Sequence, residues 1–114
     1  MNIEFYQMED GTEPVNDFIH TLDAAMYAKA MYTIELLKAR GHLLRPPYSK
    51  ELDDGIMELR ISAGNNISRI LYFFVIGNTA ILTNGFIKKT WKIPPAEIER
   101  AKQYRKDYMR RYQK

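Results

Sequence analysis

Apolar and polar positions change their period along the chain, and these changes predict its elements. Ile3-Glu4-Phe5-Tyr6 alternates, which is typical of a half-buried strand. Residues 14–22 and 24–40 have helical spacing, and Asp23 and Gly41 are suitable cap and stop residues for the second helix. The two apolar stripes are Val15, Phe18, Ile19 and Leu22, and then Tyr27, Ala30, Met31, Ile34 and Leu37. The pattern predicts a helical hairpin that packs on a sheet.

The stretch from residue 42 to residue 55 is predicted to be a linker. The adjacent prolines Pro46 and Pro47 rule out a helix there. Loops beside a sheet often carry binding residues, so Arg45, Tyr48 and Lys50 are candidate substrate contacts. Tyr48 could stack on a base, or it could pack under the loop.

Three runs rich in β-branched and aromatic residues follow, namely 57–61, 68–75 and 80–90. Gly64-Asn65-Asn66 and Gly77-Asn78 separate them as hairpin turns. A final amphipathic, basic helix begins near Pro95, with Ile98, Ala101, Tyr104, Tyr108 and Tyr112 on its apolar stripe. The predicted fold class is α+β. An N-terminal strand and the helical hairpin pack on a twisted, mainly antiparallel four-stranded sheet, and a C-terminal helix completes one domain over residues 1–114.

The turns also predict which side chains meet. A first hairpin centred between Gly64 and Asn65 places Arg60 opposite Arg69. A second hairpin centred on Gly77-Asn78 places Phe86 opposite Arg69, with Lys88 one diagonal step away on the same face. Such a cluster of cations is tolerated when it is solvated or when an anion such as phosphate sits among the charges.

Charge is divided unevenly along the chain. Residues 1–58 carry 5 lysines and arginines against 11 aspartates and glutamates, whereas residues 59–114 carry 12 against 3. A strongly basic half attracts polyanions to one side of a compact domain, so we expect contact with nucleic acid.

Composition narrows the chemistry. The chain has no cysteine, which excludes disulfides, thiolate metal sites and a thiol nucleophile. No histidine or carboxylate cluster has metal-ligand spacing, so neither a metal nor another cofactor is expected. No apolar run is long enough to cross a bilayer and no signal pattern opens the chain, so we expect a soluble cytoplasmic protein without membrane contact.

Several ordered motifs resemble the RelE/HigB superfamily of toxins from bacterial type II toxin–antitoxin systems, in particular its phage-derived HigB-like branch. The matching residues are Lys50-Glu51-Leu52, Gly55-Ile56-Met57-Glu58-Leu59-Arg60, Arg69-Ile70-Leu71-Tyr72-Phe73-Phe74, Asn84-Gly85-Phe86-Ile87-Lys88-Lys89-Thr90, and then Pro94, Pro95, Glu97, Ile98 and Ala101. They cover the second half of the chain closely, while the helical hairpin matches only in pattern. The resemblance implies a RelE-like fold and an endoribonuclease, or mRNA interferase, that cleaves messenger RNA, often on the ribosome.

The resemblance also implies partners and site residues. An antitoxin, frequently a helix-turn-helix protein, would neutralise the toxin, and operator DNA would be contacted only through that antitoxin. Arg69 matches the strand arginine that contacts the scissile phosphate in such toxins, and Lys88 and Lys89 match the basic pair that ends the last strand. Better-studied members often carry a catalytic tyrosine or histidine near the C-terminus, where this chain has Ile98.

The predicted mechanism is attack of a 2′-hydroxyl on the adjacent phosphorus, without a metal. Arg69 and Lys88 would stabilise the transition state and Arg60 would position the backbone. Lys89 would reach the same face as Arg69 and Lys88 only if the strand twists or bulges at its end. Lys92 is a further candidate substrate contact. The general base stays open between a lysine crowded by cations and Glu58, which could instead form a salt bridge with Arg60.

Two alternatives to an enzyme follow from the same residues. A non-catalytic nucleic-acid-binding module, including a toxin homologue that has lost activity, would share the basic half of the chain. A protein-interaction domain could instead present the basic surface to an acidic tail of the antitoxin. The absence of a catalytic residue at Ile98 favours the binding module, whereas the expected convergence of Arg60, Arg69 and Lys88 favours the enzyme.

Overall fold

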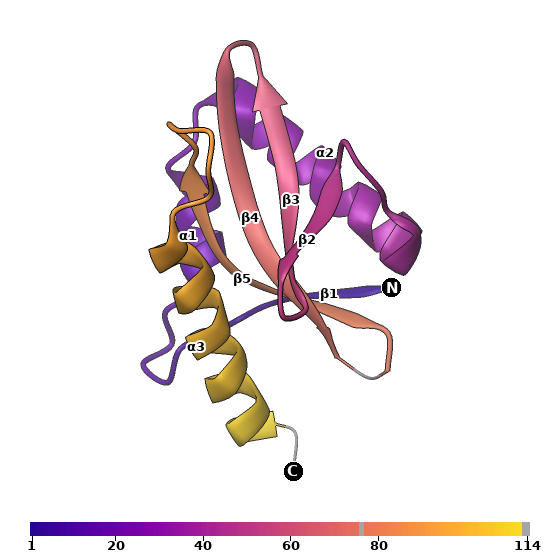
Figure 1. Cartoon of the computed structure of the whole chain (residues 1–114), viewed down its shortest axis with the longest axis vertical. Helices are drawn as coiled ribbons and strands as arrows, with labels where there is room; N and C mark the ends of the chain where they lie inside the picture. The colour runs from indigo at the N-terminus through magenta and orange to yellow at the C-terminus, as the bar shows by residue number, and fades with distance from the viewer. Residues whose placement is uncertain (76, 113–114) are drawn as a thin grey trace.

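The computed structural model describes residues 1–75 and 77–112 as one sheet with helices on both faces (Figure 1). The elements are β1 (Asn2–Phe5), α1 (Pro14–His20), α2 (Ala24–Arg40), the 3-10 helix η1 (Gly41–Leu43), β2 (Ser49–Asp53), β3 (Ile56–Ala63), β4 (Asn66–Val75), β5 (Thr79–Ile87) and α3 (Pro95–Tyr112). The strand order is β1-β5-β4-β3-β2, with β1 parallel to β5 and the other neighbours antiparallel. The predicted α+β fold with a C-terminal helix is confirmed.

The helical hairpin covers one face of the sheet, as its apolar stripes predict. The Asp23 side chain caps α2 by accepting a hydrogen bond from the Met26 backbone N–H at 2.8 Å. Gly41 ends the helix with a φ of 56°, which an L side chain rarely adopts. Val15, Ile19, Ala30, Ile34 and Leu37 are buried against Leu59, Ile61, Ile70, Tyr72 and Leu82 of the sheet. This core fixes the register of β3, β4 and β5, and therefore the side chains on the opposite face.

Gly85 lets α1 approach β5 closely. Any Cβ at position 85 would come within 3.0 Å of the Phe18 ring, so Gly85→Ala overpacks this contact. We expect the variant to lose about 1–3 kcal/mol of unfolding free energy, measured by urea denaturation. Phe18→Leu should cost less in the Gly85→Ala background than in the wild type, because the smaller side chain relieves the clash. Strictly additive losses would contradict this account.

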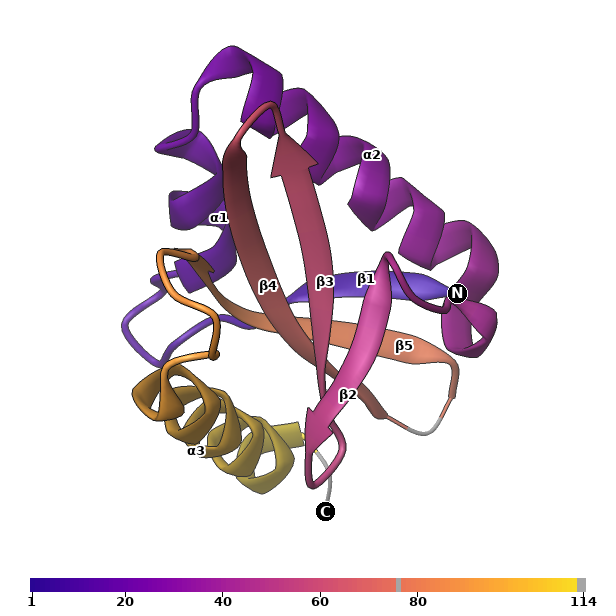
Figure 2. The same cartoon turned by 45° about the horizontal axis from the view of Figure 1, so that its top comes forward.

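Helix α3 lies against the other face of the sheet, beside the lower part of β4 and β5 (Figures 1 and 2). Ala101 and Tyr108 are buried there, and Tyr104 stacks on Tyr6 with ring centroids 4.6 Å apart. This confirms that the tyrosine stripe docks the helix on the sheet, although Tyr112 at its end is 54% exposed.

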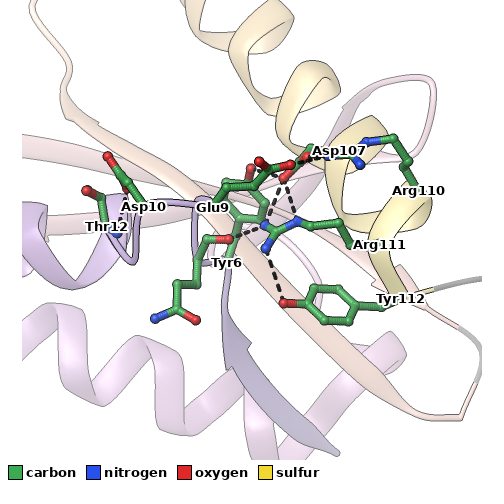
Figure 3. Close-up of polar contacts among 9 residues, drawn as sticks. Tyr6, Glu9, Asp10, Thr12, Asp107, Arg110, Arg111 and Tyr112 are labelled. Atoms are coloured by element: carbon green, nitrogen blue, oxygen red, sulfur yellow. Dashed lines mark hydrogen bonds and ion pairs between the residues drawn. The ribbon is translucent and has the colours of Figure 1, made fainter.

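Polar contacts near the C-terminal end of α3 tie it to the loop after β1 (Figure 3). Tyr6 donates a hydrogen bond to Asp107 at 2.5 Å, and Arg111 forms an ion pair with the same carboxylate at 2.8 Å. Arg110 bridges Asp107 and Glu9. The hydrogen bond from Tyr6 lowers the pKa of Asp107, and the two arginines lower it further.

This cluster should make folding sensitive to alkaline pH. Burial, and then the hydrogen bond to Asp107, raise the pKa of Tyr6 from 10.0 to about 12. Folding therefore disfavours ionisation of Tyr6, and its contribution is fully present below pH 10 and is lost as the pH rises toward about 12. We expect the unfolding free energy to fall across this window, and Tyr6→Phe to reduce the slope. Burial also raises the pKa of Tyr72 and Tyr108, so part of the slope should persist. An unchanged slope in Tyr6→Phe would contradict the assignment.

Two expectations need correction. The predicted linker from residue 42 to residue 55 contains η1 and β2, so the sheet has five strands where four were predicted. Strand β2 pairs with β3 although Ser49–Asp53 is mostly polar, because it lies at the sheet edge and buries only one side chain fully, Ser49. Tyr27 is 39% exposed, although it was placed on the buried stripe of the second helix.

Candidate functional site

The face of the sheet opposite α1 and α2 carries the predicted basic residues in adjacent rows. Arg60 is paired with Arg69, and Arg69 with Phe86, as the turns predicted. In the next row Lys50 is paired with Glu58, and Glu58 with Leu71. Because directly paired residues share a face, the arginines and Glu58 lie side by side. Helix α3 covers Leu71 and Phe73 of this face, while the β3–β4 hairpin rises past its end (Figure 1).

Glu58 joins the two arginines. Its Oε1 accepts a hydrogen bond from Arg60 Nε at 2.8 Å, and its Oε2 lies 3.2 Å from Arg69 Nε. Glu58 as a whole is 2% exposed. The predicted salt bridge between Glu58 and Arg60 is therefore present, and it extends to Arg69. One buried anion thus compensates the repulsion of two cross-strand guanidinium groups.

Arg69 is incompletely satisfied. Its side chain is buried, and its Nη1 donates a hydrogen bond to the Ser68 backbone carbonyl at 3.1 Å. Within the described residues, Arg69 Nε and Glu58 Oε2 make no hydrogen bond of acceptable geometry despite their proximity. Burial lowers the pKa of Arg69, Glu58 raises it and Arg60 lowers it. Because Nε is itself buried against Glu58, an external oxyanion would have to be bound by the terminal nitrogens of the Arg69 guanidinium.

An open cleft of about 530 Å³ adjoins these arginines at the exposed edge of β3. We call it the arginine cleft, and it is lined by Lys29, Tyr32, Thr33, Pro47, Tyr48, Arg60, Ser62 and Arg69. Tyr48, a predicted substrate contact, lies here and is 40% exposed, so its ring does not pack under the loop. Tyr32 is 55% exposed and provides a second aromatic surface. The sequence pattern did not indicate Tyr32 or Lys29, because only the fold brings α2 beside this edge.

Lys88 and Lys89 line a second cavity, of about 290 Å³, with Ile67, Thr90 and Trp91. We call it the tryptophan cavity. The Lys88 backbone N–H donates to the Ile67 carbonyl at 2.9 Å, which extends the ladder between β4 and β5 beyond the last strand residue. Both lysines contribute to one cavity, although strict alternation would separate them. The structure therefore brings Arg60 and Arg69 together in one cleft and the two lysines together in the next.

The other predicted substrate contacts lie outside these two cavities. Arg45 and Lys92 are exposed and are not among the lining residues of either. Lys50 is exposed on β2 and shares its row with Glu58, so it is on the arginine face but lines neither cavity.

Most cations of α3 are already paired within the chain. Lys102 lies 2.5 Å from Asp53, Arg105 lies 2.8 Å from Asp54, and Arg100 lies 2.9 Å from Glu97. The acidic first half of the chain thus neutralises part of the basic second half. No ion pair is found for Lys88, Lys89 or Lys92 among residues 1–75 and 77–112. The lysines after β5 are therefore better placed to receive an external polyanion than the paired residues of α3.

The described part of the chain shows neither a metal-ion cluster nor a helix that could span a membrane. Its histidine, aspartate and glutamate side chains form no group of three or more that could hold a metal ion. None of its helices combines the length and apolar character that a membrane span requires.

The element order and the three helices around a mixed sheet are those of a RelE-like α+β domain with a C-terminal helix. A family model described as "Phage derived protein Gp49-like (DUF891)" matches residues 17–106, from α1 to α3. The chain belongs to this family, which is part of the RelE/HigB-like toxins. None of the curated proteins matches the chain.

Proposed function

We propose that the chain is the toxin of a toxin–antitoxin module and that it is an endoribonuclease acting on messenger RNA. The observation that carries this proposal is the pair Arg60 and Arg69, held by the buried Glu58 on an open sheet face. Membership of the Gp49-like family supports the toxin class.

The proposed reaction uses the substrate's own 2′-hydroxyl. Its oxygen attacks the adjacent phosphorus, its proton passes to a base, and the bond to the 5′-oxygen breaks as that oxygen takes up a proton. Charge develops on the phosphate oxygens, where Arg69 can donate hydrogen bonds and Lys88 can add a positive charge. Arg60 would position the backbone. Lys89, and then Lys50, Arg45, Tyr48 and Lys92, would extend the contact along the message.

Glu58 and Lys88 remain the two candidates for the base. Glu58 lies beside both arginines, within one residue row of the proposed phosphate. Lys88 lies at the neighbouring cavity, in which Lys89 is a second cation. Glu58→Gln tests the first candidate, because the glutamine side chain cannot accept the proton.

The experiment is translation of a defined message with purified ribosomes, with the same message alone in parallel. We expect cleaved messages that end in a 2′,3′-cyclic phosphate, and no cleavage where the scissile nucleotide carries 2′-hydrogen. Lys88→Ala should slow cleavage. Lys106→Ala removes an exposed α3 lysine instead and serves as the matched control. Full-length messages throughout, with RNA still bound, would contradict the enzyme.

That last outcome would support the second candidate, a binding module without catalysis. Two observations favour it: Glu58 already compensates the arginines, and Ile98 stands where better-studied RelE-like toxins often have tyrosine or histidine. In either case we propose a cognate antitoxin as the partner, frequently a helix-turn-helix protein in such modules, with operator DNA reached only through it. Copurification of the two coexpressed chains tests this partner.

A further inference from the structure

Trp91 is the only tryptophan of the chain and is 97% exposed. It lies in the loop between β5 and α3, which stands beside the β3–β4 hairpin (Figure 1). Tryptophan is usually largely buried because its ring is large and apolar. An exposed indole beside two lysines is a candidate surface on which an aromatic ligand can stack.

The surroundings of Trp91 define the chemistry of that ligand. The tryptophan cavity is lined by Trp91 and Ile67 together with Lys88 and Lys89. Ile67 is itself 37% exposed. A flat apolar surface beside two cations suits a ligand that is both planar and anionic, and an unpaired nucleotide has this combination.

The cavity is also in register with the arginines. Ile67 precedes Arg69 by two residues on β4, so their side chains share a face and are about 7 Å apart along the strand. Lys88 is hydrogen-bonded to Ile67 through the backbone, which fixes the loop to this row. A single nucleotide can bridge that distance.

We propose that Trp91 stacks on an unpaired RNA base next to the phosphate held at Arg69, with Lys88 and Lys89 contacting the adjoining backbone. This inference rests on the proposed function, because it places the message across Arg69. Every base has an aromatic face, so the contact binds RNA with little base preference.

A protein partner fits this cavity less well. A stable protein interface buries roughly 800 Å² on each side, whereas the apolar surface here is one indole and one isoleucine in a cavity of about 290 Å³. An acidic peptide would use the lysines and leave the indole without a role.

The single tryptophan gives a direct measurement. Intrinsic fluorescence is recorded while the wild type is titrated with a short unstructured RNA made uncleavable by 2′-deoxy substitution, and with an abasic strand that has the same phosphates. We expect the RNA to quench Trp91 emission and the abasic strand to quench it much less. Trp91→Ala should bind a labelled RNA roughly 5- to 150-fold more weakly, and Trp91→Phe should lose less.

Three results would overturn the inference: unchanged emission when RNA binds, equal quenching by the abasic strand or by polyglutamate, and wild-type affinity in Trp91→Ala. Thermal unfolding of each variant confirms that it is folded. Cleavage separates this inference from the proposed function. Quenching without cleavage retains the stacking site and removes the enzyme. Cleavage by Trp91→Ala with the wild-type KM and kcat retains the enzyme and removes the stacking site.

Discussion

Arg69→Ala is expected to reduce message cleavage by about 10²- to 10³-fold, the loss typical when one preorganised donor to a developing oxyanion is removed. The structure supplies the reason. Arg69 is buried on β4 beside Glu58 and lines the arginine cleft, where its terminal nitrogens would donate to the phosphate. Single-turnover cleavage of one message, at saturating protein, measures the effect on the chemical step.

The controls separate a lost donor from a lost fold. Arg69→Lys keeps a charge beside Glu58 but lacks the planar fork of donors, so it should recover only part of the rate. Lys106→Ala should cleave at the wild-type rate. Both Arg69 variants are compared by thermal unfolding, and we expect them to fold because Glu58 also contacts Arg60 at 2.8 Å in the wild type. A folded Arg69→Ala that retains more than a tenth of the activity would remove Arg69 from the proposed chemistry.

The pairing of Arg60 with Arg69 could be predicted because the first hairpin is regular. Its turn lies at Gly64 and Asn65, and every pair from Met57 and Tyr72 to Ala63 and Asn66 follows that centre. Period-two alternation then fixes the face of each side chain. The pairing of Arg60 with Arg69 could therefore be predicted from the sequence alone.

The second hairpin has the predicted register at Arg69 but not next to its turn. Next to the turn, Val75 is paired with Thr79, one residue away from the predicted register. A bulge between Leu71 and Tyr72 inserts Thr83 and restores the predicted pairing of Arg69 with Phe86. The Thr83 hydroxyl donates a hydrogen bond to the Leu71 carbonyl at the bulge. A turn motif does not encode a bulge several residues away.

The remaining features could not be predicted from the sequence, because they depend on contacts between distant segments. Short polar edge strands such as β2 give little periodic signal, because pairing with β3 and not apolar burial holds them. The arginine cleft needs Tyr32 from α2, which only tertiary packing brings to the edge of β3. Trp91 did leave a signal, since it is an aromatic residue between Lys89 and Lys92, but its exposure is a property of the folded loop.

The distribution of charge on the folded surface also differs from what a count of charges along the sequence suggests. The basic second half of the sequence includes the C-terminal helix, yet Lys102 and Arg105 of this helix are paired with Asp53 and Asp54 at the end of β2. These exposed pairs contribute little to stability individually. Their effect is to concentrate the uncompensated positive charge on the arginine face and the loop after β5. A chain with a net charge of only +3 can therefore still carry local clusters of positive charge.

Glu58→Gln is expected to destabilise the fold by about 3 kcal/mol or more, because removing one partner of a buried ion pair leaves the other charge uncompensated. The side chains of Glu58 and Arg69 are 3% and 8% exposed, so water cannot screen the loss. Urea unfolding measures it. Glu35→Gln, on the exposed face of α2, is the matched control and should change stability by no more than about 0.5 kcal/mol.

Added phosphate should restore part of the stability lost in Glu58→Gln, since an anion that binds the folded arginine pair raises the unfolding free energy by mass action. The same phosphate should stabilise the wild type less, because Glu58 already occupies the site. Chloride at equal ionic strength is the comparison that separates binding from screening. Equal responses to the two salts would contradict an anion site at Arg60 and Arg69. Cleavage by the same folded variant in phosphate-free buffer then tests the base: retained activity excludes Glu58 and leaves the proton transfer to Lys88.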